Sequence, residues 1–469
     1  VMFSEENPQL VALENIEQTY SENHNVIIVL APSDKNVFTR ETLKAVETLT
    51  EKSWQIPYSR RVDSISNFQY TTAQGDDLIV RDMVQNASLY TNKQLDDVKR
   101  AVLAEPALAN RLISDSGDVT GININISMPE QEKAEATPLI AAFVRNIAEE
   151  LEHEYPHIKT YLSGVVMLDN SFFESSMRDF SQLVPVSFGL MMLIIAILAG
   201  GLVGTIITMI VIIASVVGAM GMSGYIGFPL TGMSTSAPII ILTVAIANCV
   251  HVLVTFTQEM GKGMTKENAM KESLRINLQP VFLASITTAI GFTSLNFSEV
   301  PPFAHLGNIV SMGVVFAFVL TVTFLPAIIA ILPSKILRKE SSTKQDTWMS
   351  TLGDVVIHRR RLLLWLLPVT MIVLISNIPR NEFNDVFVHY FDTSIPFRAD
   401  SDFMVENLTG VYINDYSLES GEPGGISNPQ FLKEVEELAL WIETLPESVH
   451  VDRFTTTMKR LNKSMHGDD

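Results

Sequence analysis

Residues 181–258 contain no Asp, Glu, Lys or Arg, and two further uncharged runs, residues 276–298 and 300–334, follow closely. A transmembrane helix needs roughly 20 mostly apolar residues to cross about 30 Å of hydrocarbon, and an ionised side chain in the middle of a bilayer is costly. A soluble core has no reason to avoid charge over such a length. This part of the chain is therefore predicted to form packed membrane helices.

Polar residues and Gly or Pro divide this region into five predicted spans, and a sixth follows the three arginines at positions 359–361. The predicted spans cover residues 183–201, 203–223, 236–257, 281–297, 308–332 and 362–378. Residues 265–275 are expected to form a short helix on the membrane surface, with Ala269, Met270 and Leu274 toward lipid and the basic residues toward headgroups.

Charge and cysteine content narrow the class of protein. The net charge of -19 comes from acidic flanks, which argue against nucleic acid as a partner because phosphates require a basic surface. The single cysteine, Cys249, falls in the third predicted span, so no disulfide is expected in the soluble parts. Because the sequence begins at Val1 without an initiator methionine, we expect a fragment.

The residues before the first span have the pattern of an α+β domain. Thr39 is a plausible N-cap for a helix that carries Leu43, Val46 and Leu49 on one face. A second helix is predicted around Leu139, Phe143, Ile147 and Leu151, and extended segments are predicted at residues 25–30, 62–70, 119–127 and 157–162. The order of these elements predicts small sandwiches with helices on one sheet face.

Loop charges orient the spans. The loops after the third and fifth spans carry several Lys and Arg residues, whereas residues 225–235 and 298–307 carry none. Under the positive-inside rule the basic loops are cytoplasmic, and both soluble parts then lie on the outer side. The expected domains are an outer α+β domain at residues 1–180, a five-helix block at 181–334 and a basic cytoplasmic loop at 335–361. A further span at residues 362–378 and the start of a second outer domain at 379–469 are expected to follow.

The end of the chain repeats part of its beginning. Seven residues between positions 43 and 63 recur in register 389 positions later: Leu43, Lys44, Val46, Glu47, Leu49, Val62 and Asp63 match Leu432, Lys433, Val435, Glu436, Leu438, Val451 and Asp452. Ser427 and Gln430 are expected to form a capping pair before the second helix. Parallel duplication is one way in which transporters are built.

These features together resemble the resistance-nodulation-division (RND) superfamily, in the branch of the MMPL (mycobacterial membrane protein large) and Patched-like proteins. The resemblance covers nearly the whole chain. It depends on the outer domain before a five-helix block, the repeated outer domain, and three segments: Ala245-Ile-Ala-Asn-Cys-Val-His251, Pro301-Pro-Phe-Ala-His-Leu-Gly-Asn308 and Phe324-Leu-Pro-Ala327.

The resemblance implies a fold of twelve membrane helices in two repeats, with ferredoxin-like outer domains. On that scheme the six predicted spans are helices two to seven, and the first five resemble a sterol-sensing domain. Such families export apolar or amphipathic molecules, using protons that enter through acidic residues in helices four and ten. The typical fourth helix has Asp where this chain has Asn248, and an amide cannot titrate near neutral pH.

Four residues are therefore candidates for the proton relay or transport: Asn248, His251, Thr287 and Thr288. His251 follows Asn248 by three residues and is expected to face the same way, with a reference pKa that suits proton transfer. Ser285, Thr287 and Thr288 make the fourth span polar and could bond Asn248 or hold water. Asn248 as a polar clasp between helices, and His251 and the hydroxyls as backbone-bonded groups, are the structural alternatives.

The sequence thus predicts a multi-pass inner-membrane exporter of lipidic or hydrophobic compounds, with membrane lipids, lipid-like cargo and protons as partners. No enzyme signature, phosphate-binding loop, metal-ligand cluster or cofactor motif is found. A non-pumping lipid or sterol sensor and an accessory to protein translocation are the alternative functions. The cargo is not encoded in a readable motif, and a homo-oligomer is left open.

Overall fold

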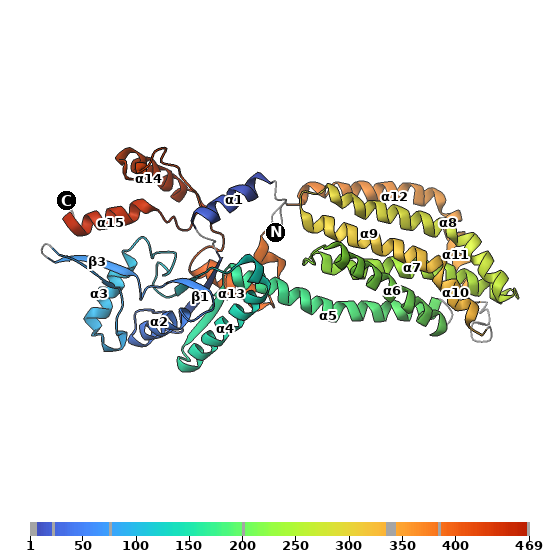
Figure 1. Cartoon of the computed structure of the whole chain (residues 1–469), viewed down its shortest axis with the longest axis horizontal. Coiled ribbons are helices and arrows are strands. Elements are labelled where there is room, and N and C mark those ends of the chain that lie inside the picture. The colour runs from blue at the N-terminus through green and yellow to red at the C-terminus, as the bar shows by residue number, and fades with distance from the viewer. Residues whose placement is uncertain are drawn as a thin grey trace. The chain divides into compact units, whose positions relative to one another are not determined.

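The computed structural model describes residues 7–20, 24–74, 77–198, 202–333, 344–382 and 386–466. The chain divides into two compact units, one made of Val1–Val11 and Phe173–Asn384 and the other of Ala12–Phe172 and Asp385–Asp469. Figure 1 labels the helices of both units and the strands β1 and β3. The domain boundaries expected from the sequence stay a prediction.

A four-stranded antiparallel sheet is the framework of the second unit. Its strands are β1 (His24–Pro32), β2 (Ser59–Asp63), β5 (Thr120–Ile126) and β6 (Ile158–Ser163), in the order β2-β5-β1-β6. Ile28 of β1 lies opposite Ile122 of β5 on one side and Leu162 of β6 on the other. The strands expected near residues 25–30, 119–127 and 157–162 are confirmed.

One continuous extended segment was expected at residues 62–70, and this prediction is wrong. β2 ends at Asp63, because the backbone N–H of the next residue, Ser64, donates to the side chain of Asn67 at 2.9 Å and closes a turn. The chain then enters β3 (Gln69–Gln74), which pairs with β4 (Asp77–Asp82) in a separate two-stranded sheet. The short helix α3 (Asn92–Leu103) follows.

Helices cover both faces of the four-stranded sheet, which corrects the expectation of helices on one face. One face packs against α2 (Arg40–Ser53) and α4 (Lys133–Glu154). On the other face, Ile27 and Val29 pack against Met404 of α13 (Pro396–Asn407). The physical reason is the continuous apolar run of β1, which leaves hydrophobic side chains on both faces of the strand.

The contacts of α13 with β6 are specific. The backbone N–H of Leu162 donates to the Asp400 carboxylate at 3.0 Å, and the rings of Tyr161 and Phe403 stack with centroids 3.7 Å apart. Burial raises the pKa of the Asp400 carboxyl above its ordinary value, although the Leu162 N–H opposes that shift. This helix is therefore part of the same hydrophobic unit as the sheet.

The buried stripe of α4 differs from the expected one. Leu139 is 56% exposed, whereas Ile140, Val144, Ile147 and Leu151 are buried. Each step of four residues rotates a helical stripe by about 40°. Three such steps carry Leu139 about 120° away from Leu151, so a stripe with spacings of four drifts off the core face.

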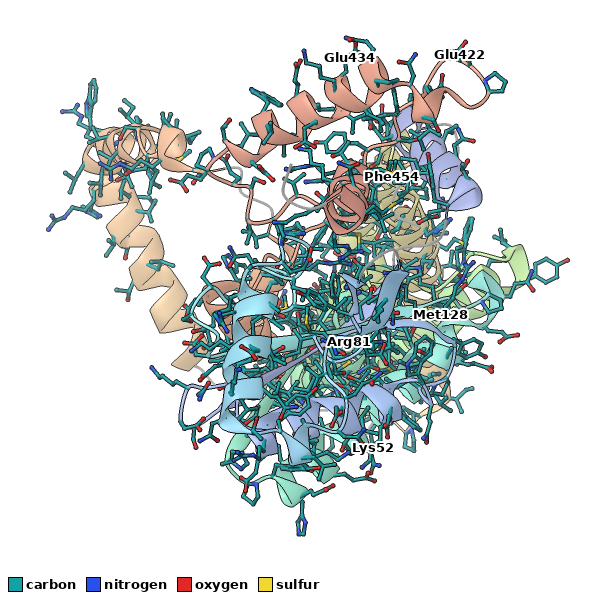
Figure 2. All side chains as sticks on the ribbon, turned by 90° about the vertical axis from the view of Figure 1, so that its left-hand side faces the viewer. Lys52, Arg81, Met128, Glu422, Glu434 and Phe454 are labelled. Carbon is teal, nitrogen blue, oxygen red and sulfur yellow. The ribbon has the colours of Figure 1, made fainter. Side chains whose placement is uncertain are left out.

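The repeated segment forms a helix in both copies. Residues of α2 recur in α14 (Pro429–Glu443), and α15 (Phe454–His466) follows; Figure 2 labels Glu434 on α14 and Phe454 at the start of α15. Thr39 caps α2 as expected, by accepting from the backbone N–H of Thr42.

The expected cap of the second copy is wrong, and the copy also lacks the strand that follows the helix in the first copy. The cap of α14 is Asn428, whose side chain accepts from the N–H of Gln430 at 2.9 Å, and not Ser427. Proline at position 429 suits the first helical position and so places the cap at Asn428. Residues 448–452, which align with β2, are assigned no strand.

Six helical segments among the described residues are long and apolar enough to cross a membrane, as the sequence predicts. They are formed by α5 (Val165–Leu198), α6 (Leu202–Ile226), α7 (Ala237–Gly261), α8 (Lys266–Thr293), α9 (Pro301–Val322) with α10 (Phe324–Ile331), and α12 (Arg360–Ile375). Two other helices are α1 (Pro8–Thr19) and α11 (Lys344–His358).

The fourth and fifth spans differ from their expected outlines. The α8 helix is continuous from Lys266, so the separate surface helix at residues 265–275 is wrong, and Ala269 and Met270 are buried in a hydrophobic cluster. The fifth span is broken at Thr323 between α9 and α10. Pro326 lacks the N–H that would continue the helical hydrogen bonds past this point.

Helix α9 lies among α6, α7 and α8, and two glycines allow its close approach. A Cβ at Gly307 would lie 2.2 Å from the carbonyl oxygen of Phe292 on α8, and one at Gly313 would lie 2.3 Å from Ile241 Cδ1 on α7. Small residues let membrane helices approach closely. The interior of this unit is therefore built around α7 and α9 (Figure 1).

Candidate functional site

The third span, α7, places the candidate residue Asn248 in the interior of the membrane unit. Pro238 lies in the first turn of the helix, where its missing N–H costs nothing. Ile241, Ala245, Val252 and Phe256 are all buried, at the spacing of a helix face. Asn248 lies on this face and is 3% exposed.

The amide of Asn248 forms a hydrogen bond across the α7–α8 interface. Its Nδ2 donates to Oγ of Ser285 at 3.1 Å, and both side chains are buried. A polar pair of this kind satisfies both groups where no water is present and ties two membrane helices together. Neither group carries a charge, so the contact itself holds no titratable proton.

His251 does not join Asn248, contrary to the expected common orientation. The Asn248 side chain is buried and the His251 side chain is exposed. A separation of three residues turns a helix by about 300°, so the two side chains diverge by about 60°. Thr255 Oγ1 donates to the backbone carbonyl of His251 at 3.0 Å. A role for His251 in proton transfer stays a prediction.

Thr287 and Thr288 bond to their own helix. Thr287 Oγ1 donates to the carbonyl of Leu283 at 2.7 Å, and Thr288 Oγ1 donates to that of Ala284 at 2.8 Å. Hydroxyls bonded one turn back are satisfied without a partner helix. Of the polar residues expected on the fourth span, Ser285 is the one whose side chain bonds Asn248.

The same interface continues as a line of polar contacts that the sequence analysis missed. Asn277 Nδ2 donates to Thr255 Oγ1 at 2.8 Å, and Ser273 Oγ donates to the carbonyl of Val252 at 2.7 Å. We call residues 273, 277 and 285 of α8 and their partners on α7 the polar seam. Asn277 follows Ser273 by four residues, a spacing that brings side chains together on a helix, and this pair of polar residues is a signal that the sequence offers.

The polar seam is interrupted once. Val281 lies between Asn277 and Ser285 in the same four-residue series and is buried. The seam therefore consists of a single contact in the middle of the span and a pair of contacts nearer the turn between α7 and α8. These hydrogen bonds do not form a continuous chain between the two parts.

A buried carboxylate lies near the end of α7. The Glu259 side chain is 8% exposed, and its Oε1 is 2.6 Å from Nζ of Lys262, which is 67% exposed. A buried carboxylate needs a nearby cation or hydrogen bonds. The ammonium group of Lys262 supplies the cation while it remains in contact with solvent. Glu259 was missed because it directly follows the uncharged stretch.

Cys249 behaves as a packed residue. It is buried in a hydrophobic cluster with Val252, Leu253 and Phe256, and its Sγ is 3.5 Å from Oγ1 of Thr321 on α9. Free cysteines of this kind pack as small apolar groups.

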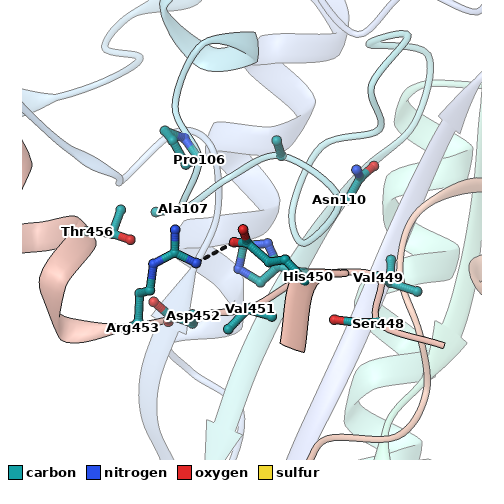
Figure 3. Close-up of a pocket in the computed structure, with 12 residues that line it drawn as sticks. Pro106, Ala107, Asn110, Ser448, Val449, His450, Val451, Asp452, Arg453 and Thr456 are labelled. Carbon is teal, nitrogen blue, oxygen red and sulfur yellow. Dashed lines mark hydrogen bonds and ion pairs between the residues drawn. The ribbon is translucent and has the colours of Figure 1, made fainter. Parts of the chain in front are cut away.

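The second unit contains a polar pocket of about 240 Å³ (Figure 3). Residues 106–110 form one side of it and residues 448–456 form another. Arg453 is held by ion pairs to Glu436 and Glu443, and Asp452 lies 3.2 Å from Arg111. Its cations and carboxylates thus largely neutralise one another.

His450 in this pocket has a pKa below its ordinary value of 6.5, chiefly because it is buried and also because Arg111 is close. The folded unit therefore favours the neutral imidazole. In the described parts of the chain, no group of three or more His, Cys, Asp or Glu side chains could hold a metal ion.

Comparisons with known proteins agree with the membrane architecture. A model of the MMPL family matches residues 2–362. The chain is 23% identical over 367 residues to the membrane protein MJ1562 of Methanocaldococcus jannaschii, and the match covers 74% of this chain and 87% of that protein.

Among solved structures, a heavy metal efflux pump matches with a TM-score of 0.42 and 13% identity, over 76% of this chain. The match covers 38% of the pump's own chain, so this chain spans well under half of that pump's length.

Proposed function

Because the chain belongs to the MMPL family, we propose that it is a membrane transporter of the RND type that exports lipidic or other hydrophobic compounds. The proposed energy source is the proton-motive force. The proposed location is the inner membrane, with both soluble parts on the periplasmic side and the basic loops in the cytoplasm. The family match carries this proposal, and the six apolar helical segments support it.

The soluble part supports the same assignment. Its β-α-β-β-α-β order and antiparallel β2-β5-β1-β6 arrangement are those of a ferredoxin-like fold. We propose that residues 1–180 form such a domain of the kind that RND transporters carry outside the membrane. The repeat in α14 supports a second copy in the later part of the protein.

The second candidate function is a lipid or sterol sensor that does not pump. One observation favours it: the buried polar residue in the middle of α7 is an amide, and Asn248 with Ser285 offers no group that gains or loses a proton. In this reading the pair is a clasp that fixes α7 against α8. An accessory role in protein translocation has no specific contact in its favour.

Proton coupling can be tested with the full-length protein in liposomes that contain a pH-sensitive dye, with a fluorescent phospholipid as the transported probe. The wild type is compared with Asn248→Asp and His251→Ala. Thr243→Ala serves as a matched control, because its hydroxyl donates to the carbonyl of Ile239 within the same helix, α7. Gel filtration of each variant checks that the protein is folded.

Probe-dependent proton entry in the wild type would support the transporter, and its loss in His251→Ala alone would assign the relay to the histidine. If the wild type moves neither protons nor probe, and Asn248→Asp gains proton entry, the pumping function is refuted for this protein. The lipid sensor is then the better description.

A further inference from the structure

A groove of about 330 Å³ lies between the beginning of α8 and helix α10. Its volume is near the lower end of the roughly 300–1,000 Å³ typical of small-molecule sites. The buried side chains of Met270 and Ile329 form its floor, and the exposed Ala327 and Ala330 of α10 border it. Because both alanines are small, the groove stays open along one face of α10.

Lys266 joins the two helices at the rim of this groove. Its Nζ donates to the backbone carbonyls of Ala330 at 2.6 Å and Leu332 at 2.9 Å. These carbonyls belong to the last turn of α10, where helical partners are missing and a cation is favoured. A lysine ammonium has three donors, so one remains after these two bonds.

A second lysine gives the rim its net charge. Lys271 is exposed and forms no ion pair with the residues that the structure describes. Glu267 is the carboxylate among the residues that line the groove. With Lys266 and Lys271, the lining therefore has two positive charges and one negative charge.

We propose that this groove binds one phospholipid with an anionic headgroup. An acyl chain lies along Met270, Ala327 and Ile329, and the headgroup phosphate is held by Lys271 and by the third donor of Lys266. Basic pockets between membrane helices are the expected sites for such headgroups. The apolar floor favours a chain of hydrocarbon, and the net positive rim favours an anionic over a zwitterionic headgroup.

The neighbouring surface supports a lipid as the occupant. Phe324 and Ile331, at the two ends of α10, are exposed, and a candidate membrane span includes the whole helix. Apolar side chains exposed on a membrane span are expected to meet lipid. An acyl chain in the groove would thus continue the surrounding hydrocarbon, whereas a soluble partner would have to displace it.

The test is native mass spectrometry of the full-length protein in detergent, titrated with phosphatidylglycerol and with phosphatidylcholine of the same acyl chains. Lys271→Gln removes the free rim charge, and Ala327→Trp fills the groove. Arg275→Gln is the matched control, because it removes one positive charge from the same helix at a 72% exposed side chain that does not line the groove.

We expect tighter binding of phosphatidylglycerol than of phosphatidylcholine by the wild type. Lys271→Gln should weaken phosphatidylglycerol binding about fivefold, the effect of one basic residue near an anionic headgroup. Ala327→Trp should abolish the preference for phosphatidylglycerol over phosphatidylcholine, and Arg275→Gln should leave that preference unchanged.

Equal binding of the two lipids by the wild type would overturn the proposal, as would a preference for phosphatidylglycerol that survives Ala327→Trp. In either case the groove is not the site that selects an anionic phospholipid. Since the measurement requires no transport, its outcome is independent of the proposed exporter function.

Discussion

Replacement of Gly307 by alanine tests how closely α8 and α9 are packed. The added Cβ would lie 2.2 Å from the carbonyl oxygen of Phe292 and 3.0 Å from Cβ of Leu295. Ordinary contacts begin at 3.4 Å, so the backbone of one helix has to move by about 1.2 Å. Backbone cannot rotate away as a flexible side chain can.

That displacement would break neighbouring hydrogen bonds. The side chains of Asn296 and Asn308 exchange two hydrogen bonds of 2.8 Å each, and Asn308 directly follows the substituted residue. A shift of about 1.2 Å would lengthen both beyond hydrogen-bonding distance. Overpacking costs about 1–3 kcal/mol and each lost hydrogen bond about 1 kcal/mol. We therefore expect a loss of about 3 kcal/mol or more.

The matched control is Gly291→Ala. Gly291 also lies in a membrane helix, but a Cβ there meets no atom within 4 Å. Alanine in a helix interior is favoured over glycine by up to about 1 kcal/mol. The two substitutions are thus chemically identical and are expected to change the stability in opposite directions.

The assay is the thermal unfolding of the purified, detergent-solubilised protein, followed by the loss of the monodisperse gel-filtration peak. Gly307→Ala should melt well below the wild type, and Gly291→Ala should melt at or above it. Equal melting temperatures for Gly307→Ala and the wild type would refute the close contact between α9 and the Phe292 carbonyl.

Three further predictions concern capping and charge. Thr39→Ala should destabilise the second unit by about 1 kcal/mol in urea unfolding. Ser427→Ala should have no effect, because Ser427 does not cap its helix. His450 has a lowered pKa in the folded state, so the unfolded chain binds a proton first as the pH falls below 6.5. Urea unfolding at pH 7.5 and 5.5 should show lower stability at the acid pH, and His450→Gln should reduce that difference. Lys262→Ala leaves the buried Glu259 carboxylate unpaired and should lower the free energy of unfolding by about 2 kcal/mol. This loss should exceed that of Glu259→Gln, which removes the negative charge itself.

The membrane spans could be predicted because the penalty for charge in hydrocarbon acts on every residue of a span. The described residues contain six candidate spans, as predicted, and the strands at residues 25–30, 119–127 and 157–162 follow from local patterns that packing did not override. Thr39 was identifiable for the same reason, since a cap depends on residues three positions apart.

The parts that were wrong or missed depend on contacts between distant residues. Nothing near Ile27 and Val29 in the sequence indicates that Met404 covers them, because this contact joins segments on either side of the membrane helices in the sequence. Likewise, the orientation of His251 is set by the position of α8 and α9 around α7. The spacing of residues along a helix gives the angle between their side chains, but it does not tell which side of the helix packs against a neighbouring helix.

The candidate relay on α7 has an uncharged pair at its centre. Asn248 is the buried polar residue in the middle of α7, but its contact with Ser285 is between two uncharged groups. Two other side chains of α7 lie elsewhere: His251 is on an exposed face, and Glu259 is beside Lys262. Val281 separates the contact of Asn248 from the rest of the polar seam. A proton path along α7 would therefore have to bypass the amide, and we expect His251→Ala and Asn248→Asp to differ in their effects on proton entry.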